Sequence, residues 1–297
     1  MSSCASRKRP ALLALWTAAT LAGCAGREAP KENVSAQTSA AAPAPEQPAA
    51  AVPLDPRLHQ SFAEATVEEP PADWQRPPDL TMTGKSIGKL YTDVVALWDQ
   101  IKFTAPTGKS LGYSAGLETD LGLIRIRLLP QIAPNHVRSF VALARSGYYD
   151  GLVFDRTIHE EIGGKPDARR ELIEAGCPLG RGDPGYGSIG YWLKPEFNGD
   201  ATHDEGTVGA SHGEEEDTAA CKFYITLCKS PYMDGSYTVF GQVTSGLDIA
   251  KKILSLPVRN DPEFPDSDRP LRPVVIRKVI IETEETDSGS PANGSKK

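Results

Sequence analysis

The pattern of apolar and polar residues predicts helices in three parts of the chain. Between Ile87 and Ile101, apolar residues lie three or four positions apart, which is the spacing of one face of an amphipathic helix. A second helix is expected from Pro134 to Gly147, because proline suits the first helical turn and glycine suits the residue after the last one. A third is expected from Leu247 to about Ser255.

Strand-like runs fill much of the chain from residue 111 to residue 281. In Leu121–Leu129, isoleucine and leucine alternate with arginine, which is typical of a half-buried strand. The other runs of this kind are Leu111–Thr119, Val208–Ala210, Phe223–Leu227, Thr238–Val243 and Val274–Ile281. Many strands, few helices and many glycine turns favour a closed antiparallel barrel or a sandwich, and the pattern alone does not choose between them.

The amino-terminal residues have the pattern of an export signal. The bases Arg7-Lys8-Arg9 precede an apolar run that ends in Leu21-Ala22-Gly23-Cys24. The run is too short for a spanning helix, which needs about 20 apolar residues, but it suits the core of a signal peptide. Its ending resembles the bacterial lipobox, which implies a removed signal peptide at residues 1–23 and a membrane lipid anchor on Cys24. The protein would then lie in the cell envelope, facing the periplasm or the exterior; the alternatives are a plain signal peptide and a chance apolar stretch.

Composition divides the rest of the chain into folded and unfolded parts. Residues 24–81 are rich in Ala, Pro, Glu and Gln, so they bury too little apolar surface to offset their ordering entropy. We expect a flexible tether there, with Phe62 and Trp74 as candidates for docking on the domain. A helical extension is expected at 82–110, a folded domain at 111–283 and a disordered tail at 284–297.

Charge and cysteine content limit the partners. The 297-residue chain has a formal net charge of −7 and no basic cluster in its folded part, which argues against a nucleic-acid partner. Nothing in the pattern indicates a coiled coil, so we expect a monomer. Cys177, Cys221 and Cys228 remain outside the signal and anchor. One disulfide and one free thiol would suit an oxidising compartment, but the spacing does not select a pair.

Several sequence blocks, in the right order, resemble those of bacterial cyclophilins. The first is Glu118–Ile158, which contains the YYDG turn and ends in FDRTI; the others are GDPGYGSIGYWLKPEF, EGTVGAS, KFYITL, MDGSYTVFGQV and PVVIRKVII, between Gly182 and Ile281. The resemblance implies a peptidyl-prolyl cis-trans isomerase domain that assists the folding of exported proteins by binding X-Pro segments. It also implies an eight-stranded antiparallel barrel, capped by two helices, with a peptide groove on its outer face.

The reaction that this resemblance implies is rotation about an X-Pro bond. The barrier is about 18–20 kcal/mol because the peptide bond has partial double-bond character. No bond is broken, so we expect no cofactor and no metal. A fixed cation that donates to the twisted amide, beside an apolar pocket for the proline ring, is sufficient. The resemblance places Arg156 in this catalytic position, and arginine suits it because the guanidinium stays charged.

The resemblance also implies the residues of the substrate groove. They are Leu172, Glu174, Ser211, His212, Lys222, Tyr224, Tyr232, Met233 and Tyr237. Leu172, Tyr224 and Met233 would form the proline pocket, with simple core packing as the alternative for each. Ser211 and His212 would line the groove beside the bound peptide.

Two of these positions, and one insertion, depart from the family pattern. Glu174 stands where the family has a glutamine, and Lys222 stands where a neutral polar residue is usual. The two side chains either pair with each other, or Glu174 holds Arg156 and competes with the peptide. A charged insertion lies within His159–Arg170. These departures favour an alternative function, a catalytically weak peptide-binding or scaffolding module of the envelope.

The histidines and cysteines suggest a third class of function, a metal-linked or redox-linked envelope protein. Their types suit zinc, but no tight spacing such as CxxC or HExxH is present. We therefore expect no metal site.

Overall fold

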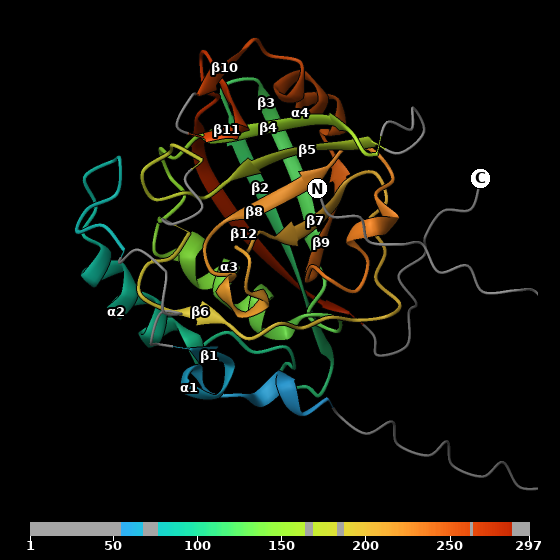
Figure 1. Ribbon diagram of the computed structural model, residues 1–297. Coiled ribbons are helices and arrows are strands. Elements are labelled where there is room, and N and C mark those ends of the chain that lie inside the picture. The colour runs from blue at the N-terminus through green and yellow to red at the C-terminus, as the bar shows by residue number, and fades with distance from the viewer. Residues whose placement is uncertain (1–54, 68–76, 164–168, 183–186, 262–263, 287–297) are drawn as a thin grey trace, which may run out of the picture. The chain divides into compact units, whose positions relative to one another are not determined.

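The computed structural model describes residues 55–67, 77–163, 169–182, 187–261 and 264–286, and of 260–261 and 264–268 the backbone alone. All of them belong to one compact unit, Val52–Lys297. Its main feature is an eight-stranded antiparallel sheet with the strand order β12-β2-β3-β9-β7-β8-β5-β4 (Figure 1). In chain order these strands are β2 (Ser110–Thr119), β3 (Gly122–Leu128), β4 (Phe154–Glu161), β5 (Arg169–Ala175), β7 (Thr207–Ala210), β8 (Phe223–Thr226), β9 (Val239–Ser245) and β12 (Ile276–Thr286).

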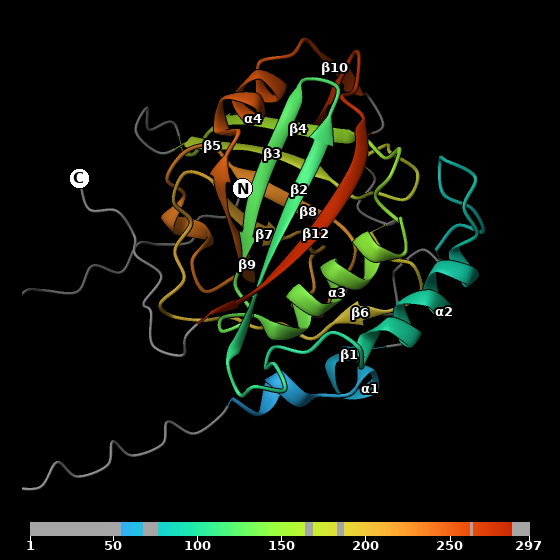
Figure 2. The same ribbon diagram turned by 180° about the vertical axis from the view of Figure 1, so that it is seen from behind.

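Shorter elements complete the fold. Two small antiparallel sheets pair β1 (Thr66–Val67) with β6 (Trp192–Leu193) and β10 (Val258–Asp261) with β11 (Phe264–Pro270). The α-helices are α1 (Phe62–Ala65), α2 (Ile87–Trp98), α3 (Pro134–Arg145) and α4 (Leu247–Leu254). Short 3-10 helices are η1 (Pro56–His59), η3 (Glu216–Thr218) and η4 (Pro231–Met233). Figures 1 and 2 show α3 and α4 near opposite ends of the sheet, with α2 beside α3.

The strand pairing corrects the expectation of a closed barrel. The sheet has two edge strands, β4 and β12, because β4 pairs along its length with β5 and meets the β12 side only where it begins. There, Val153 and Val275 form an isolated bridge, and the amide of Phe154 donates to the carbonyl of Val274 at 2.9 Å. The mainly β, antiparallel architecture is therefore shown, but a closed ladder is not.

The core lies between the sheet and α3. In β3, Ile124 and Ile126 are buried while Arg125 and Arg127 are exposed, which confirms the predicted half-buried strand. From α3, Phe140 packs edge-on against Phe223 of β8, with their ring centroids 5.6 Å apart. Alternating strand positions thus supply the core on one face and leave the other face of β4, β5 and β8 for the site.

The helices follow the predicted patterns, with small differences at their ends. Ser86 precedes α2, and its hydroxyl accepts from the amide of Lys89 at 3.4 Å. The helix ends at Trp98 rather than at Ile101, although Ile101 is also buried. Pro134 begins α3 as expected.

The tether prediction is wrong for the stretch nearest the domain. Residues 56–67 form η1, α1 and β1, because Phe62, one of the two docking candidates, finds an aromatic pocket. Its ring lies edge-on to Tyr91, Trp98 and Tyr191, at centroid distances of 5.8, 5.2 and 5.1 Å. The strand β12 also continues to Thr286, past the predicted start of the tail at 284.

Several predictions concern residues outside the described part of the chain. These are the signal peptide, the anchor at Cys24, the tether to residue 54, Trp74 and the tail from 287. Among the helices that are described, none combines the length and the apolar character needed to cross a membrane.

Candidate active site

The pairing register places the main site residues in one row across four strands. Arg156 of β4 lies opposite Glu174 of β5, Glu174 lies opposite Tyr224 of β8, and Tyr224 lies opposite Gly209 of β7. Residues directly opposite each other in neighbouring strands share a face of the sheet. This row therefore brings the predicted catalytic arginine, the family's glutamine position and a pocket residue onto one face.

A charged cluster surrounds Glu174. Its Oε1 contacts Nζ of Lys222, and its Oε2 accepts a hydrogen bond from the Ser211 hydroxyl at 2.8 Å. Nη1 of Arg156 lies 3.9 Å from Oε2, beyond hydrogen-bonding distance. The side chains of Lys222 and Glu174 are 5% and 3% exposed, whereas that of Arg156 is 21% exposed. Of the two possibilities left open by the sequence, the closer pairing is Glu174 with Lys222.

Burial and charge act in opposite directions on this cluster. Burial would raise the pKa of Glu174, but the charges of Lys222 and then Arg156 outweigh it, and the pKa is lowered. Burial would likewise lower the pKa of Lys222, but the negative charges of Glu174 and Asp155 raise it. Both groups are therefore ionised at neutral pH, and each neutralises the other.

Asp155, the residue next to the arginine, behaves differently. Burial raises its pKa to about 6, and the charge of Lys222 offsets that rise only in part. Its Oδ2 accepts from the amide of Gly182 at 2.8 Å. Asp155 lies at an irregularity of the β4–β5 pairing, between Phe154 and Arg156.

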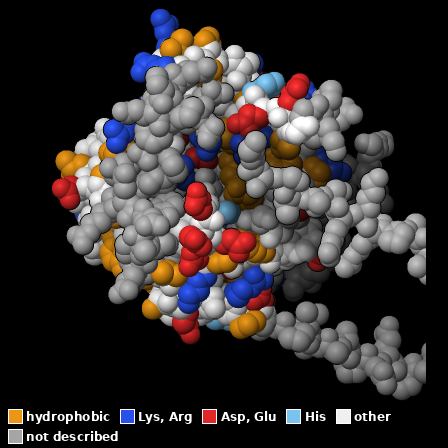
Figure 3. All heavy atoms as spheres, in the orientation of Figure 1, with side chains coloured by type: hydrophobic (Ala, Val, Ile, Leu, Met, Phe, Trp, Pro, Cys, Tyr) orange, Lys and Arg blue, Asp and Glu red, His pale blue; other side chains and the backbone are white. Residues whose placement is uncertain are grey.

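An apolar cluster lies beside the arginine and is separate from the main core. It is formed by Ile158, Leu172, Tyr224 and Met233, with Tyr237 packed against it. Four of these are predicted groove residues, so the structure brings them together. Ile158 was missed, although its position two residues after Arg156 in a strand indicates the same face. Figure 3 shows hydrophobic side chains recessed below the surrounding surface on this side of the molecule.

Aromatic residues form one wall of this cluster. The ring of Tyr237 stacks on His212 at 4.3 Å and meets Tyr224 edge-on at 5.9 Å. The two ring nitrogens of His212 lie 2.7 Å from the Gly213 carbonyl oxygen and 2.9 Å from that of Ser236. His212 thus links the segment after β7 to the loop before β9.

The rim of the site is charged and partly aromatic. Tyr232 is 43% exposed. The insertion extends the β4–β5 hairpin, with Glu161 opposite Arg169. Across it, Arg170 pairs with Glu160 at 2.5 Å, and within β5 Glu171 lies 3.3 Å from Arg169. The added charges in the described part of the hairpin are therefore largely paired with each other.

The described residues include the histidines and cysteines considered for metal or disulfide chemistry. They contain no group of three or more His, Cys, Asp or Glu side chains suited to hold a metal ion. Cys177 and Cys221 are buried free thiols, and Cys228 is a partly exposed one.

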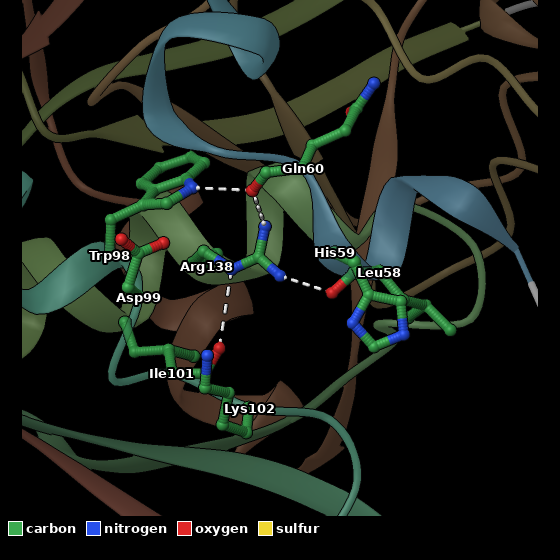
Figure 4. Close-up of a pocket in the computed structure, with 8 residues that line it drawn as sticks. All are labelled: Leu58, His59, Gln60, Trp98, Asp99, Ile101, Lys102 and Arg138. Carbon is green, nitrogen blue, oxygen red and sulfur yellow. Dashed lines mark hydrogen bonds between the residues drawn. The ribbon is translucent and has the colours of Figure 1, made fainter.

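A second, polar pocket lies elsewhere, between η1, the end of α2 and α3 (Figure 4). Arg138 is buried there, and its guanidinium donates to the carbonyls of Leu58 at 2.7 Å, Gln60 at 3.3 Å and Ile101 at 3.4 Å. These bonds hold the amino-terminal segment on the domain. None of the lining residues belongs to the groove.

The fold and the site define a class of protein: an antiparallel β domain that presents an arginine beside an apolar, aromatic-walled recess. A family model described as "Cyclophilin type peptidyl-prolyl cis-trans isomerase/CLD" matches residues 115–281. The chain belongs to this family, and it is an isomerase of the cyclophilin type.

Two individual relatives agree with this assignment. The chain is 35% identical over 164 residues to the peptidyl-prolyl cis-trans isomerase ppi1 of Schizosaccharomyces pombe, covering 55% of this chain and 96% of that protein. It is 30% identical to the peptidyl-prolyl cis-trans isomerase-like 2 of Rhizopus delemar, covering 62% of this chain but only 31% of that protein. A crystal structure of a Cryptosporidium parvum cyclophilin is similar with 22% identity and a TM-score of 0.49, covering 58% of this chain and 98% of that one.

Proposed function

We propose that the chain accelerates cis-trans isomerisation of X-Pro bonds through Arg156. In the twisted amide, conjugation is lost and the prolyl nitrogen becomes a better hydrogen-bond acceptor. The guanidinium donates to that nitrogen, while the proline ring occupies the apolar cluster with Leu172, Tyr224 and Met233. The observation that carries this proposal is the position of a partly exposed arginine on the same sheet face as a separate apolar cluster.

The energetics suit this arrangement. The uncatalysed barrier is about 18–20 kcal/mol. The rate rises tenfold for each 1.36 kcal/mol by which the barrier is lowered. A preorganised cation in a partly dry site can supply several such steps, because it needs no reorganisation during the reaction. Arg156 is held at 21% exposure, so it is shielded from bulk water but accessible to a bound peptide.

The acidic replacement at Glu174 is compatible with this mechanism. Its carboxylate oxygens are engaged by Lys222 and by the Ser211 hydroxyl, and Arg156 is farther away. The charge of Glu174 is thus compensated within the protein. This supports turnover in spite of the departure from the family's glutamine.

The cellular role follows from the sequence patterns at the amino terminus. We propose a lipid anchor at Cys24, an envelope location, and clients among exported proteins with X-Pro segments. The pattern Leu21-Ala22-Gly23-Cys24 and the preceding bases support this. We further propose that α2 is an addition to the family's fold and that the protein is monomeric.

The decisive experiment measures exchange on short X-Pro peptides, by NMR or a protease-coupled assay, with the unit Val52–Lys297. We expect the protein to accelerate the exchange, and we expect the acceleration to be at least about 100-fold smaller in Arg156→Ala. This corresponds to a barrier about 2.7 kcal/mol higher. The matched control is Arg125→Ala, an exposed arginine of β3 that pairs with Glu282 on another part of the sheet. Acceleration that survives Arg156→Ala would contradict the arginine mechanism.

The second candidate function is a peptide-binding or scaffolding module without useful turnover. The buried charges of Glu174 and Lys222, at positions where the family has neutral side chains, favour it. Saturable binding of X-Pro peptides by folded protein, with no acceleration across varied X residues, would establish this function instead.

A further inference from the structure

A chain of two hydrogen bonds, centred on the buried His203, lies behind the proline pocket. Oδ1 of Asp234 is 2.7 Å from Nδ1 of His203, and Nε2 of His203 is 2.8 Å from the hydroxyl oxygen of Tyr224. The side chain of His203 is 1% exposed, and Tyr224 is also buried. His203 is not among the predicted groove residues, yet it contacts one of them directly.

The partners determine the direction of each hydrogen bond. An ionised carboxylate only accepts, so Nδ1 of His203 carries the proton and donates to Asp234. When the ring carries only this proton, Nε2 is an acceptor, and the hydroxyl of Tyr224 donates to it. The donor capacity of Tyr224 is therefore used inside the protein and is not directed at a substrate.

The neighbouring strand is adapted to the same hydroxyl. Gly209 of β7 lies opposite Tyr224, and a Cβ atom at position 209 would be 2.1 Å from the hydroxyl oxygen of Tyr224. Such an approach is impossible for a real side chain, so the tyrosine ring reaches His203 only because residue 209 is glycine. Burial also raises the pKa of Tyr224 well above its ordinary value, in keeping with a neutral hydroxyl donor.

On the basis of the proposed function, we propose that His203, oriented by Asp234, is a positioning residue that fixes the ring of Tyr224 as a wall of the proline pocket. A buried hydroxyl without an acceptor is unfavourable. Without His203, the hydroxyl regains a partner by turning toward water in the groove. The ring would then occupy space that the proline ring needs, so peptide affinity falls.

The test compares His203 variants with and without the Tyr224 hydroxyl. The readouts are the Kd of an Ala-Pro-containing tetrapeptide, from NMR titration, and kcat and KM separately. We expect His203→Leu to raise Kd and KM about tenfold, the equivalent of one hydrogen bond of about 1.36 kcal/mol, with a smaller change in kcat. His203→Gln restores most of the affinity, because its amide oxygen accepts from Tyr224 while its NH₂ group donates to Asp234.

In the Tyr224→Phe background there is no hydroxyl to position. We therefore expect His203→Leu to leave Kd unchanged there, which a merely structural role for His203 would not produce. The control is His59→Leu, an exposed histidine of η1. If His203→Leu does not fold, Asp234→Asn provides the same comparison in both backgrounds, because asparagine no longer fixes the histidine tautomer.

Two results would overturn the inference. One is an equal rise in Kd with and without the hydroxyl; the other is no rise in Kd for His203→Leu. Peptide binding is read independently of turnover. Loss of turnover with the Kd pattern intact would therefore count against the proposed isomerase mechanism and not against the role of His203.

Discussion

Lys222 and Glu174 form a buried ion pair at the centre of the site, with Nζ of the lysine against Oε1 of the glutamate. Glu174 is in β5 and Lys222 immediately precedes β8, the strand paired with β5. Burying two charges is costly, and their mutual attraction offsets that cost only while both are present. The pair therefore behaves as a unit. Replacing one member should cost more stability than half of the loss caused by replacing both.

The first prediction concerns the free energy of unfolding of neutral variants of this pair. We expect Glu174→Gln or Lys222→Gln alone to lower it by about 3–5 kcal/mol, because an uncompensated buried charge remains. The double variant, with two neutral amides, should lose much less than the sum of the two. Urea unfolding of all four proteins gives the coupling energy. Additive losses would show that the two side chains do not act as a pair.

The second prediction concerns the pH dependence of stability. Burial raises the pKa of Asp155 from 3.8 to about 6, so the folded state favours the protonated form. The stability that Asp155 contributes is complete below its unfolded pKa and is lost as the pH rises through about 6. We expect Asp155→Asn to match the parent near pH 4 and to exceed it by up to about 3 kcal/mol above pH 7. Its amide oxygen can still accept from Gly182.

Unfolding curves at pH 4, 5, 6 and 7 test this sign. Glu174 provides the opposite case, because its pKa is lowered by Lys222 and Arg156 in spite of burial. Its contribution is present above its ordinary pKa and is lost as the pH falls. An Asp155→Asn advantage that is constant with pH, or greatest near pH 4, would contradict the proposed burial effect.

Much of the fold was predictable from local pattern. The alternation of Ile124 and Ile126 with arginines predicted a strand that is half buried, and it is. The sequence did not show whether the edge strands β4 and β12 pair with each other and close the sheet. That depends on the curvature of the whole sheet. The docking of Phe62 depended on a pocket formed by Tyr91, Trp98 and Tyr191, residues far from it in sequence.

The site was predictable to the extent that residues share a strand face. The family blocks pointed to Leu172, Tyr224 and Met233, which do form one cluster. They did not show which partner Glu174 selects, since that choice is decided by distances within the folded sheet. His203 was missed for a related reason: its role depends on the hydroxyl of Tyr224, and the sequence does not show that the two meet.

A third prediction concerns the docked amino-terminal segment. Phe62→Ala removes a buried ring from an aromatic cluster, so we expect the free energy of unfolding to fall by about 3–5 kcal/mol. The matched control is Leu271→Ala, an exposed apolar residue, with a change within about 0.5 kcal/mol. The peptide KM should stay the same in the folded variant, because Phe62 contacts α2 and not the groove. A small loss of stability would mean that the segment is held by its backbone bonds to Arg138 instead.

The last prediction concerns the accessibility of the three thiols in the unit Val52–Lys297. Cys177 and Cys221 are buried free thiols, whereas Cys228 is partly exposed. Burial raises the pKa of Cys221 to about 12, so its reactive thiolate is scarce at neutral pH. With a chromogenic disulfide reagent at pH 8, we expect one fast thiol in the native protein and three after unfolding without reductant. The Cys228→Ser variant should lose the fast phase alone. Only one thiol after unfolding would show that Cys177 and Cys221 pair in the protein as isolated, and would contradict the reduced, buried arrangement beside Lys222.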